Sequence, residues 1–278
     1  MIELYNEVCF KTSKIVTTKY STSFSIGILL LDKEIRKHIY SIYGFVRLAD
    51  EIVDTFHDTD QKYQLEKFEK DTYEAIESKV SLNPVLHSFQ MTVNHYKIKH
   101  SHIDAFLNSM KMDLYDLEYD QDQFEKYIFG SAQVVGLMCL QVYTDGAEGE
   151  YEKLKDSAIR LGSAFQKINF LRDLKEDTND LGRSYFPSLD IKKIDEKSKK
   201  EIEADIKNDF ELALIGIKQL PNNSKLGVYT AYLYYNALLN KIKKLSATKI
   251  MNKRIRISNF NKFIIMILAK IRILTKSM

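Results

Sequence analysis

The chain has 278 residues, enough for one large domain or two small ones, and contains only 10 Gly and 3 Pro. So few helix-breaking residues predict long helices and an all-α protein. Its two cysteines, Cys9 and Cys139, lie far apart without C-x-x-C spacing. This argues against a disulfide framework or a zinc site and favours a reducing, cytoplasmic location.

The formal net charge of +3 conceals an uneven distribution of charge. Residues 241–278 contain eleven Lys or Arg and no acidic residue, whereas the first 240 residues contain 30 basic and 38 acidic residues. The body is therefore near −8 and the tail near +11. This division predicts a tail that contacts an anionic surface.

Neither a secretory signal nor a membrane span is predicted. The first seven residues contain no basic residue and no long apolar run. The longest apolar run covers residues 263–269 and is followed by Lys270 and Arg272, while a span needs about 20 residues.

Apolar residues recur at helical spacing through most of the chain. In residues 35–55, for example, Ile35, Ile39, Ile42 and Val46 keep one face apolar. Further helices are predicted at residues 2–19, 61–78, 84–96, 102–115, 123–142, 150–178, 197–218 and 225–244. Residues 179–194 are predicted to form a loop. Without internal repeats or strand-like alternation, the pattern favours one helical domain over residues 1–278, with a basic amphipathic tail from about residue 245.

Asp50 and Asp54 stand four residues apart on one predicted helix face, and Arg47 lies one turn before Asp50. Aligned carboxylates repel each other, and Mg²⁺ held by carboxylates and phosphate oxygens removes that repulsion. For this pair alone, a solvated acidic face is the commoner explanation. The apolar neighbours Ile52 and Val53 instead favour a position at the wall of a cavity.

A second cluster places Asn169, Asp173 and Asp177 at i, i+4 and i+8, with Gln166 one turn earlier. This row of side-chain oxygens could bind Mg²⁺ or its coordinated water. Two guanidinium groups, those of Arg172 and Arg183, could bind phosphate directly. A salt-bridged surface helix is the alternative, and two acid pairs with arginine in one chain make it less favoured.

Diphosphate chemistry would require such a layout. A divalent metal neutralises the leaving diphosphate as a Lewis acid. Loss of diphosphate from an allylic carbon leaves a carbocation, which an apolar cavity protects from water. The 17 Tyr and 15 Phe could line that cavity, because aromatic faces attract cations.

At these residues the sequence resembles the squalene/phytoene synthase family of head-to-head prenyl transferases, from about residue 20 to 262. The similar segments are Tyr20-Ser-Thr-Ser-Phe24, residues 43–54 with both first-motif aspartates, residues 127–136 ending in Val-Gly, residues 164–177, residues 182–187 and Tyr235-Asn-Ala-Leu-Leu239. Two departures are Tyr20, where many members have His, and Phe129, where relatives often carry Tyr.

The resemblance implies a single-domain isoprenoid synthase fold, a helical bundle around a central apolar cavity. It also implies a two-step reaction through a cyclopropylcarbinyl diphosphate. When the family's residue roles are carried over by position, the ligands of Mg²⁺, or alternatively Mn²⁺, would be Asp50, Asp54, Asn169, Asp173 and Asp177. Diphosphate would be bound by Ser21, Ser23, Arg47, Arg172, Arg183 and Tyr185. The cavity would be lined by Phe24, Tyr43, Gln166 and Tyr235. The catalytic set would be the four aspartates with Tyr43 and Arg47.

The preferred prediction is condensation of two geranylgeranyl diphosphates to phytoene in carotenoid biosynthesis. The alternative is a squalene or dehydrosqualene synthase that uses farnesyl diphosphate, with NADPH needed only for squalene. A third class is a non-catalytic helical assembly factor, which would be expected to lack some of the motif acids.

Three further predictions concern the surface. Asp113, Asp116, Asp120 and Asp122 are predicted to be solvated, and Glu51 and Glu176 to be outer or solvent-facing groups. The tail is predicted either to lie on anionic lipid, as a peripheral membrane contact on the cytoplasmic face, or to form a last core helix with a solvated cationic face. Nucleic-acid binding is disfavoured because no basic–aromatic motif accompanies the charge. The oligomeric state is left open.

Overall fold

Helices form the regular structure of this chain. The computed structural model describes residues 1–115, 119–179, 186–187, 194–252 and 254–278, without the side chains of residues 175–179. Within these ranges every regular element is helical, so the all-α prediction is confirmed. In chain order they are α1 (Ile2–Tyr20), α2 (Thr22–Leu29), α3 (Lys33–Asp54), α4 (Gln61–Ser78), α5 (Pro84–Tyr96), α6 (His100–Met112), α7 (Gln121–Ile128), the π-helical turn η1 (Phe129–Gln133), α8 (Val134–Tyr143), α9 (Glu148–Asn179), α10 (Glu196–Ile217), α11 (Asn222–Lys243), α12 (Ala247–Asn252) and α13 (Asn259–Leu274).

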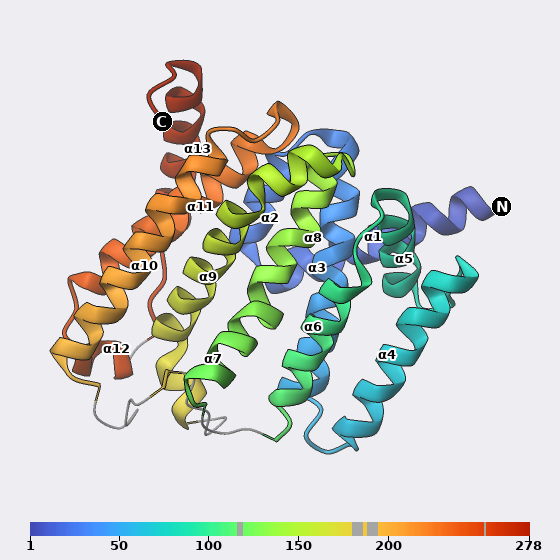
Figure 1. Cartoon of the computed structure of the whole chain (residues 1–278), viewed down its shortest axis with the longest axis horizontal. Helices are drawn as coiled ribbons and strands as arrows, with labels where there is room; N and C mark the ends of the chain where they lie inside the picture. Colours follow the sequence, from blue (N-terminus) through green and yellow to red (C-terminus); the bar gives the residue numbers. More distant parts are fainter. Residues whose placement is uncertain (116–118, 180–185, 188–193, 253) are drawn as a thin grey trace.

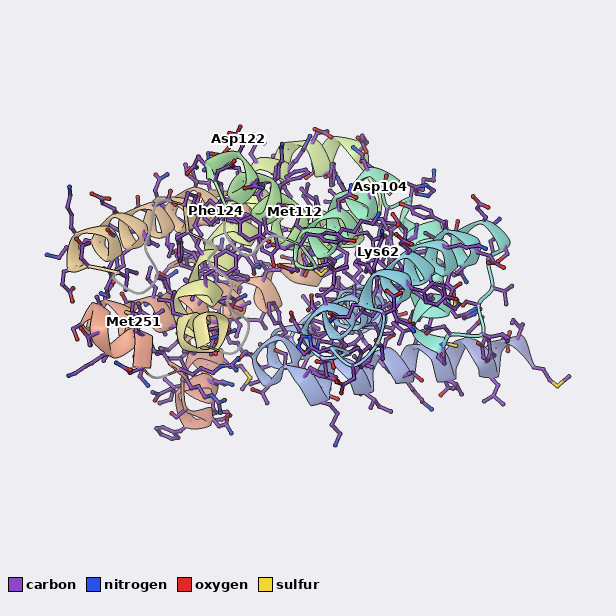
Figure 2. All side chains as sticks on the ribbon, turned by 90° about the horizontal axis from the view of Figure 1, so that it is seen from below. Lys62, Asp104, Met112, Asp122, Phe124 and Met251 are labelled. Carbon is purple, nitrogen blue, oxygen red and sulfur yellow. The ribbon has the colours of Figure 1, made fainter. Side chains whose placement is uncertain are left out.

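The long α9 and the α7–α8 pair run through the middle of the molecule (Figure 1). Helices α10 to α13 lie on one side of them, and α3 to α6 lie on the other. Seen from below, Met251 of α12 and Lys62 of α4 are on opposite sides, with Met112 and Phe124 between them (Figure 2). The start of α1 and the end of α13 project at opposite ends of the molecule.

The core consists of three clusters of buried apolar side chains. The first joins α3 to α6 and α8, and in it Phe45 stacks on Phe89 with ring centroids 4.0 Å apart. The second joins α7 and α9 to α12, and the third lies between α8, α9, α10 and α11. Ile42, Tyr235 and Leu140, one from each cluster, line the same cavity. The clusters therefore surround one internal space.

Local chemistry accounts for where several helices begin. Asp60 caps α4 by accepting a hydrogen bond from the Tyr63 backbone N–H at 2.9 Å. Asn83 caps α5, whose first residue is Pro84, a position where a missing N–H costs nothing. The predicted helices at 61–78 and 84–96 are confirmed with the same bounds.

The predicted helical stretch over residues 123–142 is confirmed, but its middle part, η1, is a π-helical turn between α7 and α8. Two glycines sit at the close approaches around this turn. A Cβ at Gly130 would lie 2.3 Å from the Ala105 carbonyl oxygen of α6, and one at Gly162 of α9 would lie 2.8 Å from the Ala132 carbonyl oxygen. The π turn is therefore packed between two helices that approach its backbone. Such turns are frequent at functional sites.

Helices α2, α12 and α13 are not among the helices predicted one by one. Helix α2 has eight residues and α12 has six, too short for a clear helical period. Among the described residues, none of the helices is long and apolar enough to cross a lipid bilayer.

Candidate active site

A cavity of about 810 Å³ lies between α2, α3, α8, α9 and α11. Apolar and aromatic side chains form most of its wall. The charged side chains of the described wall are five cations and one carboxylate: Arg47, Arg172, Arg254, Arg256, Lys262 and Asp50. An apolar space with a strongly cationic side suits a ligand that has an anionic head and a long apolar body.

Helix α3 supplies Arg47 and Asp50 to this wall. Arg47 Nη1 lies 3.7 Å from Asp50 Oδ2, and Arg47 also forms an ion pair with Glu51. Its guanidinium carbon lies 4.4 Å from the centroid of the Tyr20 ring. An aromatic face and two carboxylates therefore hold this cation at the edge of the cavity. Of the two predicted positions for Glu51, outer or solvent-facing, the structure shows the first, because Glu51 is buried and pairs with the wall residue Arg47 one helical turn earlier.

Helix α9 supplies the second polar row. Gln166 Nε2 donates to Ser131 Oγ of η1 at 3.2 Å, and Asn169 Nδ2 donates to Gln166 Oε1 at 3.3 Å. Tyr235 of α11 donates its hydroxyl proton to Asn169 Oδ1 at 3.2 Å. This chain of hydrogen bonds fixes the orientation of both amides. The π turn takes part in it through Ser131.

Two arginines contact Asp173 of α9. Arg172 Nε lies 2.9 Å from Asp173 Oδ1, and Arg254 Nε lies 3.0 Å from the same oxygen. Burial is the largest single effect on Arg172 and disfavours its charge, but the hydrogen bonds to Asp173 and the electrostatic interactions with Asp173, Tyr235 and Tyr234 together raise the pKa of this guanidinium. Asp173 therefore lies between two permanent cations, both of which line the cavity.

Aromatic rings join the two motif helices. Phe24 of α2 lies 5.8 Å from Tyr43 of α3, 6.4 Å from Phe165 of α9 and 6.1 Å from Tyr235 of α11, measured between ring centroids. Phe165 and Tyr235 stack at 3.9 Å. Burial and the nearby Asp50 charge raise the pKa of Tyr43, and burial raises that of Tyr235. Both phenols therefore stay neutral near pH 7.

The sequence pattern of the squalene/phytoene synthase family matches residues 17–261, most of the chain. The chain belongs to this family. Among its curated relatives is the chloroplastic phytoene synthase of Daucus carota, 27% identical over 248 residues that cover 82% of this chain and 61% of the carrot protein. The phytoene synthase of Arthrospira platensis is 24% identical, with 98% of this chain and 99% of that protein covered.

A solved dehydrosqualene synthase has the same fold. It is similar with a TM-score of 0.84 and 21% identity, and the match covers 97% of this chain and 98% of that one. This chain spans about three fifths of two plant relatives, 61% of the carrot protein and 58% of the phytoene synthase of Narcissus pseudonarcissus.

The structure brings most of the predicted family site residues to one cavity. Its wall includes Ser21, Ser23, Phe24, Tyr43, Arg47, Asp50, Gln166, Asn169, Arg172 and Tyr235. Asp54, the last residue of α3, and Asp173 follow the wall residues Asp50 and Asn169 by one helical turn and are not part of the wall. Ser21 Oγ caps α2 by accepting from the Phe24 backbone N–H at 3.2 Å. The Asp177 side chain, Arg183, Tyr185 and the Glu176 side chain lie outside the described residues.

Arg254 is a site residue that motif reasoning missed. It lies in the basic tail, eighty-one residues after its partner Asp173, so neither helical spacing nor the acid motifs point to it. The available signal was the tail's charge, which the sequence analysis assigned to an anionic surface. Arg254, Arg256 and Lys262 instead direct part of that charge into the cavity.

Asp113 also differs from its prediction. It is buried and accepts hydrogen bonds from Tyr127 at 2.8 Å and Tyr119 at 3.3 Å. The prediction that it is solvated is therefore wrong, whereas Asp122 is exposed and Asp120 caps α7 as expected of surface acids. Asp116 lies outside the described residues. Since Tyr127 lines the cavity, Asp113 orients a wall residue.

The carboxylate and amide oxygens near the cavity decide whether the site suits Mg²⁺. Among the described side chains, no three His, Cys, Asp or Glu residues lie close enough to hold a metal by themselves. Asp50 of α3 and Asp173 of α9 instead offer hard oxygen donors singly, beside Asn169. Because Mg²⁺ is usually bound by one or two carboxylates plus substrate phosphates, these residues fit an ion that arrives with a diphosphate.

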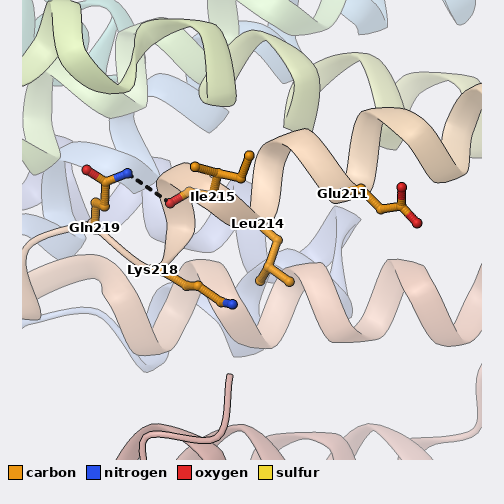
Figure 3. A pocket seen from close by; sticks show the side chains of 5 residues that line it. All are labelled: Glu211, Leu214, Ile215, Lys218 and Gln219. Atoms are coloured by element: carbon orange, nitrogen blue, oxygen red, sulfur yellow. Dashed lines mark hydrogen bonds between the residues drawn. The ribbon is translucent and has the colours of Figure 1, made fainter.

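A second hollow of about 340 Å³ lies on the outer surface of α10 (Figure 3). It is lined by Glu211, Leu214, Ile215, Lys218 and Gln219, and Gln219 Nε2 donates to the Ile215 carbonyl at 3.2 Å. None of the motif residues that the structure describes lines this hollow. Ten of the predicted site residues line the central cavity instead.

Proposed function

We propose that the chain is a prenyl transferase that condenses two prenyl diphosphates head to head, with geranylgeranyl diphosphate as substrate and phytoene as product. The observation that carries this proposal is the single cavity onto which Arg47 and Asp50 of α3 and Asn169 and Arg172 of α9 converge. The family membership and the names of the carrot and Arthrospira relatives support it.

The charged side of the cavity would hold the diphosphates. Arg172 and Arg254 can each bind two phosphate oxygens, since guanidinium matches phosphate geometry. Both arginines contact Asp173. With substrate and metal bound, the two arginines would contact phosphate oxygens and Asp173 would be a metal ligand. Asp50, Asp54, Asn169, Asp173 and Asp177 would hold Mg²⁺, or Mn²⁺, which would supply Lewis-acid activation of the leaving group.

The apolar side would hold the prenyl chains and protect the carbocation. Phe24, Tyr43, Phe165 and Tyr235 form a connected set of rings whose faces can stabilise positive charge. Because burial keeps Tyr43 and Tyr235 protonated, neither would act as a phenolate that captures the cation. The first condensation would release one diphosphate and one proton and give a cyclopropylcarbinyl diphosphate. Loss of the second diphosphate, rearrangement of the resulting cation and loss of a second proton would then give the hydrocarbon.

The test is to incubate the purified chain with Mg²⁺ and either geranylgeranyl or farnesyl diphosphate, with and without NADPH, and to identify the hydrocarbon by mass spectrometry. The proposal predicts phytoene from geranylgeranyl diphosphate without NADPH. A product from farnesyl diphosphate alone would assign the chain to squalene or dehydrosqualene synthesis. No product from either substrate would contradict the enzyme proposal and favour a non-catalytic helical protein.

A further inference from the structure

The outward face of α13 is apolar. Seven large side chains on this helix are between 38% and 73% exposed. They are Phe260, Phe263, Ile264, Ile267, Leu268, Ile271 and Leu274. At 3.6 residues per turn they fall within an arc of about 140° on one side of the helix. A continuous exposed apolar face of this kind indicates an interaction surface.

The opposite face of α13 fixes the helix to the body. Lys262 and Ala269 are buried, and α13 packs on α11. Lys262 Nζ donates to Thr22 Oγ1 of α2 at 2.7 Å, and Arg272 Nη1 lies 3.5 Å from the Tyr229 hydroxyl of α11. The narrow buried side thus faces the core and the broad apolar side faces solvent. This arrangement differs from a last core helix that exposes a cationic face.

The charged residues around this apolar face indicate which kind of partner could cover it. Residues 259–278 contain four Lys or Arg and no acidic residue. By helical geometry Lys270 and Arg272 flank the apolar arc, one on each side, and both are exposed. Long cationic side chains in such positions can extend to lipid phosphates while the apolar residues enter the acyl region.

We propose that the outward face of α13 docks on a lipid bilayer that contains anionic headgroups, with the helix lying in the plane of the interface. The same helix borders the cavity, because Asn259 and Lys262 of its first turns line the wall while Phe260 and Phe263 face outward. Docking would therefore place this side of the cavity against the membrane. The docking face is independent of the reaction proposed above.

The chain has no Trp, so one introduced Trp reports only its own surroundings. Phe263→Trp is expected to shift its emission to the blue with vesicles of equal parts phosphatidylcholine and phosphatidylglycerol, and brominated acyl chains should quench it. Binding to vesicles of phosphatidylcholine alone should be about tenfold weaker, and salt should weaken binding to the anionic vesicles. The matched control is Leu82→Trp, an exposed position between α4 and α5 at the far end of the molecule, whose emission should not change.

A double variant, Ile267→Asp with Ile271→Asp, should lose flotation with anionic vesicles while keeping its melting temperature and its hydrocarbon synthesis in detergent. Unchanged flotation of this variant, or no lipid-dependent shift of Phe263→Trp, would overturn the proposal. An equal shift at Leu82→Trp would do the same, since adsorption would then not involve α13. A blue shift without vesicles that grows with protein concentration would assign the face to a second copy of the chain instead.

Discussion

Asp173 is the carboxylate that pairs with two cations of the candidate site. Its carboxylate contacts Arg172 and Arg254, from α9 and from the tail. This carboxylate offsets the charge of two cations that both line the cavity. Its expected roles as ion-pair partner and as metal donor therefore both depend on its negative charge.

Replacement of that charge gives a direct prediction. Asp173→Asn keeps the shape of the side chain but removes a metal donor, so hydrocarbon formation should fall by about 10²–10³-fold, the range seen when one electrostatic contact to a transition state is lost. The measurement is initial rate at limiting Mg²⁺. Asp58→Asn, at an exposed position just after α3, is the control and should leave the rate unchanged. A near-normal rate for Asp173→Asn would exclude the metal role.

The hydroxyl of Tyr235 gives a second prediction. Tyr235 is buried and donates its proton to the half-buried Asn169, so Tyr235→Phe leaves Asn169 Oδ1 without that partner. Unfolding free energy, measured with urea, should fall by about 0.5–1.5 kcal/mol, the usual net contribution of one hydrogen bond. Tyr234→Phe, one residue earlier and less buried, should cost less. Equal losses in the two variants would show that the hydrogen bond is not the cause.

At the scale of elements, η1 is the feature that ties the site to its scaffold. It separates α7 from α8, and it supplies Ser131 and Ala132 to the cavity wall. Gly130 and Gly162 let α6 and α9 approach its backbone. The position of the amide row on α9 therefore depends on two glycines outside the row itself.

Packing around η1 can be tested with alanine. At Gly130 a Cβ would lie 2.3 Å from a backbone carbonyl oxygen, whereas at Gly149 it would meet nothing within 4 Å. Gly130→Ala should therefore destabilise the fold by about 1–3 kcal/mol. Gly149→Ala should be neutral or stabilise it by up to about 1 kcal/mol, because alanine loses less backbone entropy in a helix. Urea denaturation of both variants measures this difference, and equal unfolding midpoints would contradict the close packing at Gly130.

Helical periodicity was sufficient to predict the long amphipathic helices. For α4 and α5 it also gave the bounds, because the caps and apolar stripes of these helices are local in sequence. It could not predict η1, which depends on helices packed from elsewhere in the chain. Motif spacing likewise placed Asp50 and Asn169 correctly at one cavity. Motif spacing could not identify Arg254 as a cavity residue, since nothing in the local sequence relates this tail residue to Asp173. The sequence left Glu51 either outer or solvent-facing, because spacing alone does not show that Arg47 pairs with it in the folded chain.

At the scale of the whole molecule, folding also buries neutral histidines away from the site. His38 bonds Thr92 Oγ1 through Nδ1 at 2.9 Å, and burial, with the nearby Lys37 charge, lowers its pKa from 6.5 to about 3. The unfolded chain therefore binds a proton in a range of pH where the folded chain does not. Stability from this group is complete above about pH 6.5 and is lost as pH falls toward 3.

His38→Asn removes this titrating group. The wild type should lose more unfolding free energy than the variant when the pH is lowered from neutral to about 4, even if the variant is less stable at pH 7. Urea denaturation at several pH values measures the difference. Parallel curves for the two proteins would contradict the expected contribution of His38.

The cationic side chains of the basic tail lie at two places in the molecule. Arg254, Arg256 and Lys262 line the cavity, while Lys270 and Arg272 border the exposed face of α13. The basic tail thus contributes cations both to the cavity wall and to the surface that we propose binds lipid. Helix α13 takes part in both, because it packs on α11 and supplies Lys262 to the wall.

The stoichiometry of diphosphate release shows directly whether this cavity joins two prenyl diphosphates head to head. Head-to-head condensation through a cyclopropylcarbinyl diphosphate releases two diphosphates for each hydrocarbon and leaves none on the product. We expect this ratio with geranylgeranyl diphosphate and Mg²⁺. One diphosphate released per pair of substrates, with the other retained on a longer prenyl chain, would show head-to-tail elongation and contradict it.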